Sequence, residues 1–282
     1  MLAFSLTTPP SGLLSQPLLH ARSPLCPSIP FRTRVSHGQS TFTHSIKTPS
    51  LPRHSPHHGP TMEVATHHVP TLYHVPWFCS SVPYQLVLEL AIPPTSLDVI
   101  TITEAQLRTS SEIEFLSPRR LVPFIAFPDG SVLLELGAIV LYMCETFDTE
   151  HTLHPPPGDP RRPRFFQGVV YAVAEAYRAV MDVFRETFGK ADSGINKPVV
   201  AKLRDRFSIV VVEHLVLELE EQGRMYYLGD EFSAVDILFG YILMTAKCTD
   251  AGLLENEFVR EYHDRIVERP AYKELFSRAS VR

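Results

Sequence analysis

Acidic residues are absent from the first 62 positions, and this absence divides the sequence into two parts. The same stretch holds five of the 26 lysines and arginines and ten of the 25 prolines, with much serine, threonine and histidine. A segment of this composition lacks periodic apolar residues and does not bury enough surface to form a packed core. We therefore predict a disordered N-terminal leader over residues 1–66.

Two interpretations of this leader stay open. The lack of acidic residues together with serine and arginine is typical of an organellar transit peptide, which would place the protein in a plastid or another organelle. The many prolines disfavour the amphipathic helix of a mitochondrial signal. The alternative is a dispensable extension ahead of a second start at Met62, with a cytoplasmic protein.

The rest of the chain lacks an excess of positive charge, because it carries all 31 acidic residues and only 21 basic ones. Such a body has no general attraction for nucleic acid or anionic membranes, so we expect neither as a partner. Its apolar runs, such as Ser131 to Cys144, are too short to cross a bilayer. The four cysteines are widely spaced, and the histidines between His54 and His68 lack ordered acidic partners, so we expect no metal site.

Strand-like and helix-like segments alternate between residues 67 and 150, which predicts a compact α/β domain. A proline-rich linker is expected over 151–163, and the segments after it have helical spacing only, which predicts an all-α bundle over 164–282. The segments expected in the first domain are a strand at 71–74, a helix at 82–90, a strand at 97–102, a helix at 104–115, a hairpin at 122–134 and a helix at 138–147.

Cys79 occupies a junction that suits reactive sulfur. The run Pro76-Trp77-Phe78-Cys79-Ser80-Ser81-Val82-Pro83 lies where the first strand ends and the first helix begins. Free backbone N–H groups and the helix dipole stabilise a thiolate there. Cys79 is therefore either the reactive group or the neighbour of a bound anionic sulfur, and simple burial of a small side chain is the alternative.

The pattern Pro-x-x-Cys-Ser-x-x-Pro before an apolar helix resembles the cytosolic glutathione transferases, and among these most closely the bacterial beta class. The resemblance implies a thioredoxin-like, glutathione-binding domain followed by a helical domain. It also implies that Cys79 is catalytic. Ser80 is the second candidate, because related classes use a serine at this turn to hydrogen-bond the thiolate.

Two further segments resemble the glutathione-binding motifs of this family. The stretch around Val122 resembles the segment with a cis proline, which implies that Leu121, Val122 and Pro123 contact the cysteinyl part of glutathione. The stretch Leu133 to Ile139 resembles the motif in which an acid and a helix N-terminus hold the γ-glutamyl group. This implies contacts from Glu135 and Leu136.

Leu136 departs from the serine or glycine usual in the family and removes a hydroxyl donor. The expected loss is about one hydrogen bond to a charged group, about 1.5–3 kcal/mol. Tyr177 and Arg178 stand where the beta class offers a histidine and a lysine. Ser233 and Asp236 match the family's helix-capping box, a folding motif, and Glu268 to Tyr272 matches the start of its final helix.

Three functions stay open at this point. The resemblance implies conjugation of the glutathione thiolate, glutathione being the co-substrate, to a small-molecule electrophile in detoxification by a homodimer. The second function is thiol transfer or reduction through a mixed disulfide on Cys79. The third is a non-catalytic binding or assembly module. The walls expected for the electrophile are Trp77, Phe165, Tyr171 and Tyr177.

Overall fold

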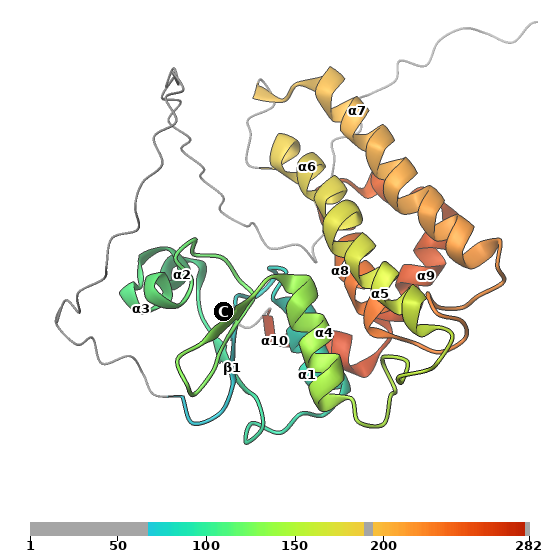
Figure 1. Ribbon diagram of the computed structural model, residues 1–282. Coiled ribbons are helices and arrows are strands. Elements are labelled where there is room, and N and C mark those ends of the chain that lie inside the picture. Colours follow the sequence, from blue (N-terminus) through green and yellow to red (C-terminus); the bar gives the residue numbers. More distant parts are fainter. Residues whose placement is uncertain (1–66, 189–193, 280–282) are drawn as a thin grey trace, which may run out of the picture.

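The computed structural model describes residues 67–188 and 194–279 of the chain (Figure 1). A small sheet with helices forms the first unit and a bundle of helices forms the second, which confirms the predicted fold class. The predictions for the leader, residues 1–66, lie outside the described residues. The elements of the first unit are β1 Thr71–His74, α1 Ser81–Glu89, β2 Asp98–Thr101, α2 Glu104–Thr109, α3 Ser111–Leu116, β3 Phe124–Ala126, β4 Val132–Leu134 and α4 Leu136–Phe147.

The sheet has the strand order β2-β1-β3-β4. β1 runs parallel to β2 and antiparallel to β3, so that Leu72 lies opposite Val99 on one side and Ile125 on the other. β3 and β4 form the predicted hairpin, in which Ala126 lies opposite Val132. This mixed order is the thioredoxin-like arrangement, and every strand expected from the sequence is present.

One expected helix is two helices. The segment 104–115 was predicted as continuous, but α2 ends at Thr109 and α3 begins at Ser111. Ser110 between them has an extended backbone, and its hydroxyl oxygen accepts a hydrogen bond from the N–H of Ile113 at 3.3 Å. A serine in this conformation caps a new helix instead of continuing the old one.

Successive side chains of the strands point to opposite faces of the sheet and therefore pack into two separate cores. Leu72 and Ile125 point into a core shared with α1, α4 and the helical unit. Tyr73 and Phe124 point the other way and stack at 4.5 Å in a second core that includes residues of α2 and α3. Because both faces of the sheet are covered, all four residues of β1 are buried.

The helical unit is built from long helices that contain π-helical turns. α5 continues through η1 into α6, and α7 continues into η3, so each forms a long rod in Figure 1. The described segments agree with the predicted helices, and α5 begins at Arg162; the boundaries of the two domains and the linker stay a prediction. The elements are α5 Arg162–Tyr171, η1 Ala172–Ala176, α6 Tyr177–Thr187, α7 Lys197–Phe207, η3 Ser208–Glu213, η4 Val216–Glu220, α8 Ala234–Thr249, η5 Ala251–Leu254, α9 Glu257–Val267 and α10 Pro270–Ala279.

The predicted capping box forms at the start of α8, the most buried helix of the bundle. The backbone N–H and the hydroxyl of Ser233 donate to one carboxylate oxygen of Asp236 at 2.8 and 2.7 Å. The other oxygen accepts from the N–H of Tyr227 at 2.8 Å and the hydroxyl of Tyr262 at 2.6 Å. Asp236 is fully buried, so this carboxylate organises the centre of the bundle.

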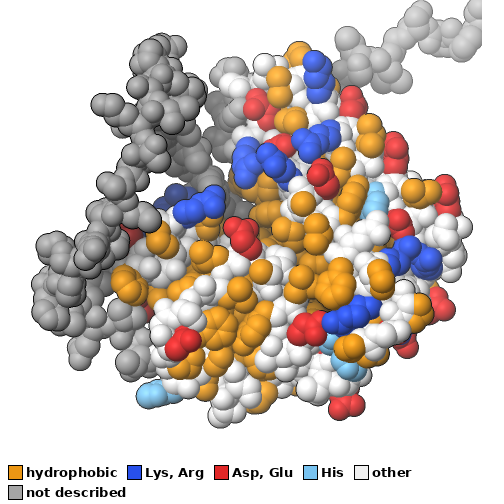
Figure 2. All heavy atoms as spheres, viewed as in Figure 1, with side chains coloured by type: hydrophobic (Ala, Val, Ile, Leu, Met, Phe, Trp, Pro, Cys, Tyr) orange, Lys and Arg blue, Asp and Glu red, His pale blue; other side chains and the backbone are white. Residues whose placement is uncertain are grey.

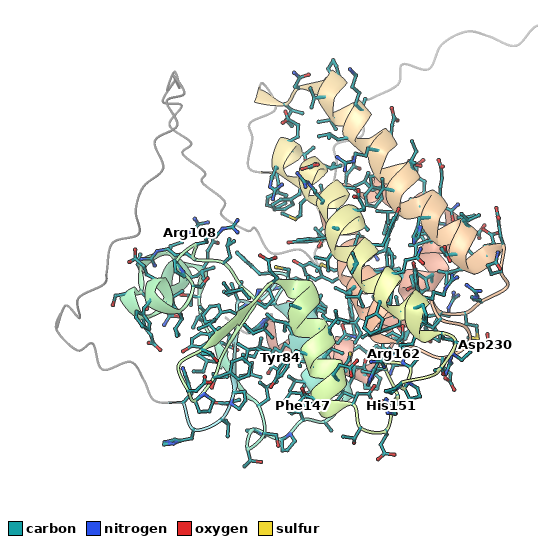
Figure 3. The ribbon with its side chains drawn as sticks, in the orientation of Figure 1. Tyr84, Arg108, Phe147, His151, Arg162 and Asp230 are labelled. Atoms are coloured by element: carbon teal, nitrogen blue, oxygen red, sulfur yellow. The ribbon has the colours of Figure 1, made fainter. Side chains whose placement is uncertain are left out.

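Two arginines join the units. Arg269, at the start of α10, donates to both carboxylate oxygens of Glu89 on α1, at 2.8 and 2.7 Å. Arg162 on α5 forms an ion pair with Glu145 on α4, and it also donates to the carbonyl of Pro155 at 2.5 Å in the connection between these helices, where Figure 3 labels Phe147 and His151 nearby. The helix whose N-terminus faces Cys79 is therefore held from the helical unit as well as from the sheet.

Candidate functional site

Cys79 lies in the loop between β1 and α1, directly before the N-cap residue Ser80. Its thiol donates a hydrogen bond to the backbone carbonyl of Val122 at 3.2 Å. The Val122–Pro123 peptide bond is cis, as the resemblance implies. The structure thus brings together two predicted site segments that are 43 positions apart in the sequence.

The helical unit contributes two phenols to the same place. Tyr177, the first residue of α6, lies close enough to Cys79 for its side chain to lower the pKa of the thiol. Tyr241 on α8 lies against Tyr177, with ring centroids 6.0 Å apart, and its hydroxyl donates to the carbonyl of Trp77 at 3.1 Å. Trp77 has a left-handed backbone, with φ of 71°, in the loop that carries Cys79.

The Cys79 thiol is neutral in this setting. Burial raises its pKa, and the Glu135 carboxylate acts in the same direction. The Tyr177 side chain and backbone groups at residues 79 and 80 oppose the increase without cancelling it. This differs from the expectation that the end of α1 by itself stabilises a thiolate, because desolvation of the charged sulfur outweighs the helix terminus.

Ser80 is held in the interior of the first unit. Its hydroxyl donates to the carbonyl of Val75 at 3.1 Å and accepts from the N–H of Val75 at 3.0 Å, and it lies 3.1 Å from Nδ1 of His74. The residue is fully buried, and burial lowers the pKa of His74 to about 4. The Ser80 hydroxyl therefore closes the turn between β1 and α1, with its donor and acceptor capacity already used there.

The residues expected to hold glutathione lie around the start of α4. Glu135 is exposed as the N-cap residue of α4, with φ of 73°, and its charge reaches Cys79. Leu121 is exposed, whereas Val122 and Pro123 are buried. Leu136 is only 7% exposed and packs in the large core, so its side chain points away from the exposed Glu135 carboxylate. Its backbone N–H lies in the first turn of α4, where N–H groups have no acceptor within the helix.

The four residues expected to form the electrophile pocket separate into two groups. Tyr177 reaches Cys79, and Trp77 lies in the Cys79 loop and packs on Phe276 at 5.0 Å. Phe165 is fully buried in the core, and the Tyr171 hydroxyl donates to the carbonyl of Val210 at 2.8 Å. These two side chains point into the helical bundle.

Sequence reasoning missed Tyr241 and Phe276. Tyr241 lies in α8, where every residue from Ala234 to Ala246 is buried, so no apolar periodicity distinguishes a residue of the site from one of the core. Phe276 lies near the end of α10, about 200 positions after Trp77 in the sequence. Neither position carries a motif.

The groove found in the described part of the chain lies away from the Cys79 site. A groove of about 720 Å³ is lined by α7, η3, η4 and η5, and none of the predicted site residues lines it. Within 67–188 and 194–279, no group of three or more histidine, cysteine, aspartate or glutamate side chains is placed to hold a metal ion. The same part of the chain contains no helix with the length and apolar character needed to span a membrane.

Comparison with known proteins supports the fold. No protein-family model and no curated protein sequence matches the chain. A solved sphingomonad glutathione S-transferase complexed with glutathione is 20% identical and covers 75% of this chain and all of its own, with a TM-score of 0.60.

Two further solved structures extend this likeness. The beta class glutathione S-transferase of Sphingomonas chungbukensis is 23% identical over 75% of this chain and all of its own, with a TM-score of 0.57. A glutathione transferase from Phanerochaete chrysosporium, solved with oxidized glutathione, is 17% identical and covers 74% of this chain and 94% of its own, with a TM-score of 0.61. The chain therefore has the glutathione transferase fold.

Proposed function

We propose that this protein is a glutathione transferase, which binds glutathione between the β3–β4 hairpin and the start of α4 and transfers its thiolate to an electrophilic small molecule. One observation carries the proposal. Cys79, Val122, Glu135 and Tyr177 come from four different segments: the Val122 carbonyl accepts a hydrogen bond from the Cys79 thiol, and Glu135 and Tyr177 both act on the pKa of that thiol. The fold shared with structures solved with glutathione or oxidized glutathione supports the choice of ligand.

Each part of glutathione has a counterpart in this arrangement. The free N–H groups of the first turn of α4 suit the γ-glutamyl carboxylate, and Glu135 suits the ammonium group beside it. The Val122 carbonyl, which accepts from Cys79 here, is a backbone acceptor for the peptide part. The glutathione thiol then lies beside Cys79 and Tyr177.

The reaction needs an ionised thiol. A free thiol with a pKa of about 8.5 is about 3% ionised at pH 7, and lowering its pKa by about two units raises the ionised fraction to about three-quarters. A phenol that donates to the sulfur stabilises the thiolate form. The thiolate then attacks the electrophilic carbon, a sulfur–carbon bond forms, and the leaving group departs with the electron pair.

Isothermal titration with glutathione, followed by conjugation assays on a panel of electrophiles, tests the proposal. We expect binding that weakens at least tenfold in Glu135→Gln, because the variant loses the charge opposite the ammonium group. Glu150→Gln, at an exposed glutamate after the other end of α4, is the matched control and should bind like the unmodified protein. If the protein neither binds glutathione nor conjugates any electrophile, it is a binding or assembly module and the proposal fails.

Cys79→Ser separates conjugation from thiol transfer. Reduction of a mixed disulfide requires the Cys79 sulfur itself and should be lost in the variant. Conjugation uses the sulfur of glutathione and should continue. The raised pKa of the Cys79 thiol, caused mainly by its burial, favours conjugation because a neutral thiol is a poor nucleophile.

We also propose that the protein forms a homodimer through the face drawn in Figure 2. Hydrophobic side chains gather there over the hairpin and α4. Leu134 at the end of β4 is 41% exposed and Val170 on α5 is 59% exposed. Sedimentation velocity should give a dimer, and Leu134→Glu should shift it toward monomer; a monomeric unmodified protein would contradict this part.

A further inference from the structure

Trp77 stands at the start of the loop that carries Cys79, and its backbone is strained. Its φ of 71° lies in the left-handed region, which residues other than glycine seldom adopt unless their surroundings hold them there. Two residues further on, the Cys79 thiol donates to the Val122 carbonyl at 3.2 Å. The conformation of Trp77 therefore sets where the site sulfur lies.

The helical unit contacts this strained residue at two points. The Tyr241 hydroxyl on α8 donates to the Trp77 carbonyl at 3.1 Å. The Phe276 ring on α10 packs on the Trp77 ring with centroids 5.0 Å apart, and Tyr272 supports Phe276 at 4.5 Å. The hydrogen bond joins residues 164 positions apart, so it forms only when the helical unit is packed on the sheet.

Hydrogen bonds within the first unit do not replace these contacts. The Phe78 N–H donates to the Val75 carbonyl at 3.1 Å, and the Ser81 N–H donates to the Phe78 carbonyl at 2.8 Å. Among the described residues, Tyr241 is the one donor to the Trp77 carbonyl. Without its hydroxyl, this peptide group has no protein donor that favours the strained conformation.

We propose that Tyr241 and Phe276 form a clamp on Trp77, which holds the Cys79 loop in its strained conformation and keeps the sulfur against the Val122 carbonyl. The proposal rests on the proposed function for the part that this sulfur plays in catalysis, whereas the clamp itself is a statement about the loop. Tyr241 and Phe276 are positioning residues, because they act on the sulfur through Trp77.

Loss of either contact should raise the population of molecules in which the loop is open. Tyr241→Phe keeps the ring and loses only the hydroxyl, and Phe276→Leu keeps an apolar side chain and loses the ring pair. The net contribution of one hydrogen bond, or of one aromatic pair beyond its buried area, changes such an equilibrium about two- to tenfold. We expect a rise of this size in each variant.

Hydrogen exchange of the full-length protein, followed by mass spectrometry of a peptide covering residues 77–82, measures this opening. The N–H groups of Ser81 and Val82 donate to the carbonyls of Phe78 and Cys79 at 2.8 and 3.1 Å, and they exchange when these bonds open. The peptide should exchange about two- to tenfold faster in both clamp variants.

Alkylation of Cys79 by iodoacetamide at a fixed pH measures the same opening at the sulfur, because the open loop releases the thiol from the Val122 carbonyl. Its rate should rise by a similar factor in the clamp variants. Neither measurement uses glutathione, so both stay informative if the proposed function fails. In conjugation, the clamp variants should lower kcat and leave the KM for glutathione unchanged, since its charged end is bound at α4.

Two matched controls lose the same kind of contact elsewhere. Tyr262→Phe loses a hydrogen bond from a buried phenol to Asp236 at 2.6 Å. Phe188→Leu loses a ring pair with Phe184 at 4.6 Å. In both controls the peptide covering residues 77–82 should exchange as in the unmodified protein, whereas a purely structural role of the clamp would make all four variants alike.

The proposal is overturned if Tyr241→Phe and Phe276→Leu exchange at the rates of their controls. It is also overturned if exchange becomes faster while the alkylation rate of Cys79 stays unchanged, because the sulfur is then held by other contacts. If Tyr241→Phe does not fold, the comparison of Phe276→Leu with its control decides in the same way.

Discussion

Gly168 marks a close approach of α5 to its neighbours in the bundle. A methyl group at this position would lie 2.6 Å from Cε1 of Tyr227 and 2.9 Å from Cγ1 of Val235. Tyr227 has little room to move, since it is 1% exposed and its N–H donates to Asp236 at 2.8 Å. Its hydroxyl lies 3.1 Å from Nε2 of His214. Gly168→Ala must therefore push α5 away from the bundle.

The size of the effect follows from two opposing contributions. Overpacking a core costs about 1–3 kcal/mol. Alanine in place of glycine inside a helix stabilises the folded state by about 0.5–1 kcal/mol. With the ring of Tyr227 fixed on several sides, we expect a net loss of about 1–2 kcal/mol in the free energy of unfolding, or about 2–8 °C in Tm for a chain of this size.

Gly137→Ala on α4 is the matched control. A methyl group there would lie 3.7 Å from Cγ2 of Val173, an ordinary contact. The variant should be unchanged or more stable by up to about 1 kcal/mol. Thermal and urea unfolding followed by circular dichroism measures both. If Gly168→Ala is as stable as Gly137→Ala, the close approach of α5 to Tyr227 is not present in solution and the reasoning is refuted.

Three other predictions concern buried groups. Asp236→Ala leaves four buried donors without their acceptor and should lower the free energy of unfolding by about 2–4 kcal/mol. Removal of an ordinary helix cap costs about 1 kcal/mol. Urea unfolding of the variant and the unmodified protein measures the difference. Burial lowers the pKa of His74, His214 and His263 to about 4. The unfolded chain therefore binds protons first, and stability that is present above pH 6.5 is lost toward pH 4, with a slope of up to about 4.1 kcal/mol per pH unit near pH 5. His263→Phe should remove about a third of this slope, and an unchanged slope would contradict the assignment. Leu136→Ser should lower Tm without improving glutathione binding, because the side chain points into the core; tenfold tighter binding by calorimetry would show that it faces the ligand instead.

Local interactions determined most of the secondary structure, and these can be read from the sequence. Thr71–His74 is a strand because its apolar residues lie between two prolines, and Pro128-Asp129-Gly130 makes a turn because a glycine tolerates its positive φ of 83°. Each depends only on residues a few positions apart. The order of the motifs around Cys79, Val122 and Glu135 was also readable, since each has its own short pattern.

The direction of each side chain at the site was decided only by the tertiary structure. Tyr171 and Tyr177 lie on one continuous helical rod, yet one points to Val210 and the other to Cys79. The π-helical turn between them, Ala172–Ala176, breaks the period of 3.6 residues on which any reading of a helical face depends.

The same limit applies to Leu136 and Tyr241. Leu136 points into the core because α4 packs on the neighbouring helices, and Tyr241 reaches the Cys79 loop from a helix that is buried on all sides. No spacing within either segment contains this information. The sequence by itself determined which segments surround the Cys79 sulfur. The packing of the helical unit on the sheet decided which side chains lie next to that sulfur. This packing could not be read from the sequence because it depends on contacts between residues about 100 or more positions apart.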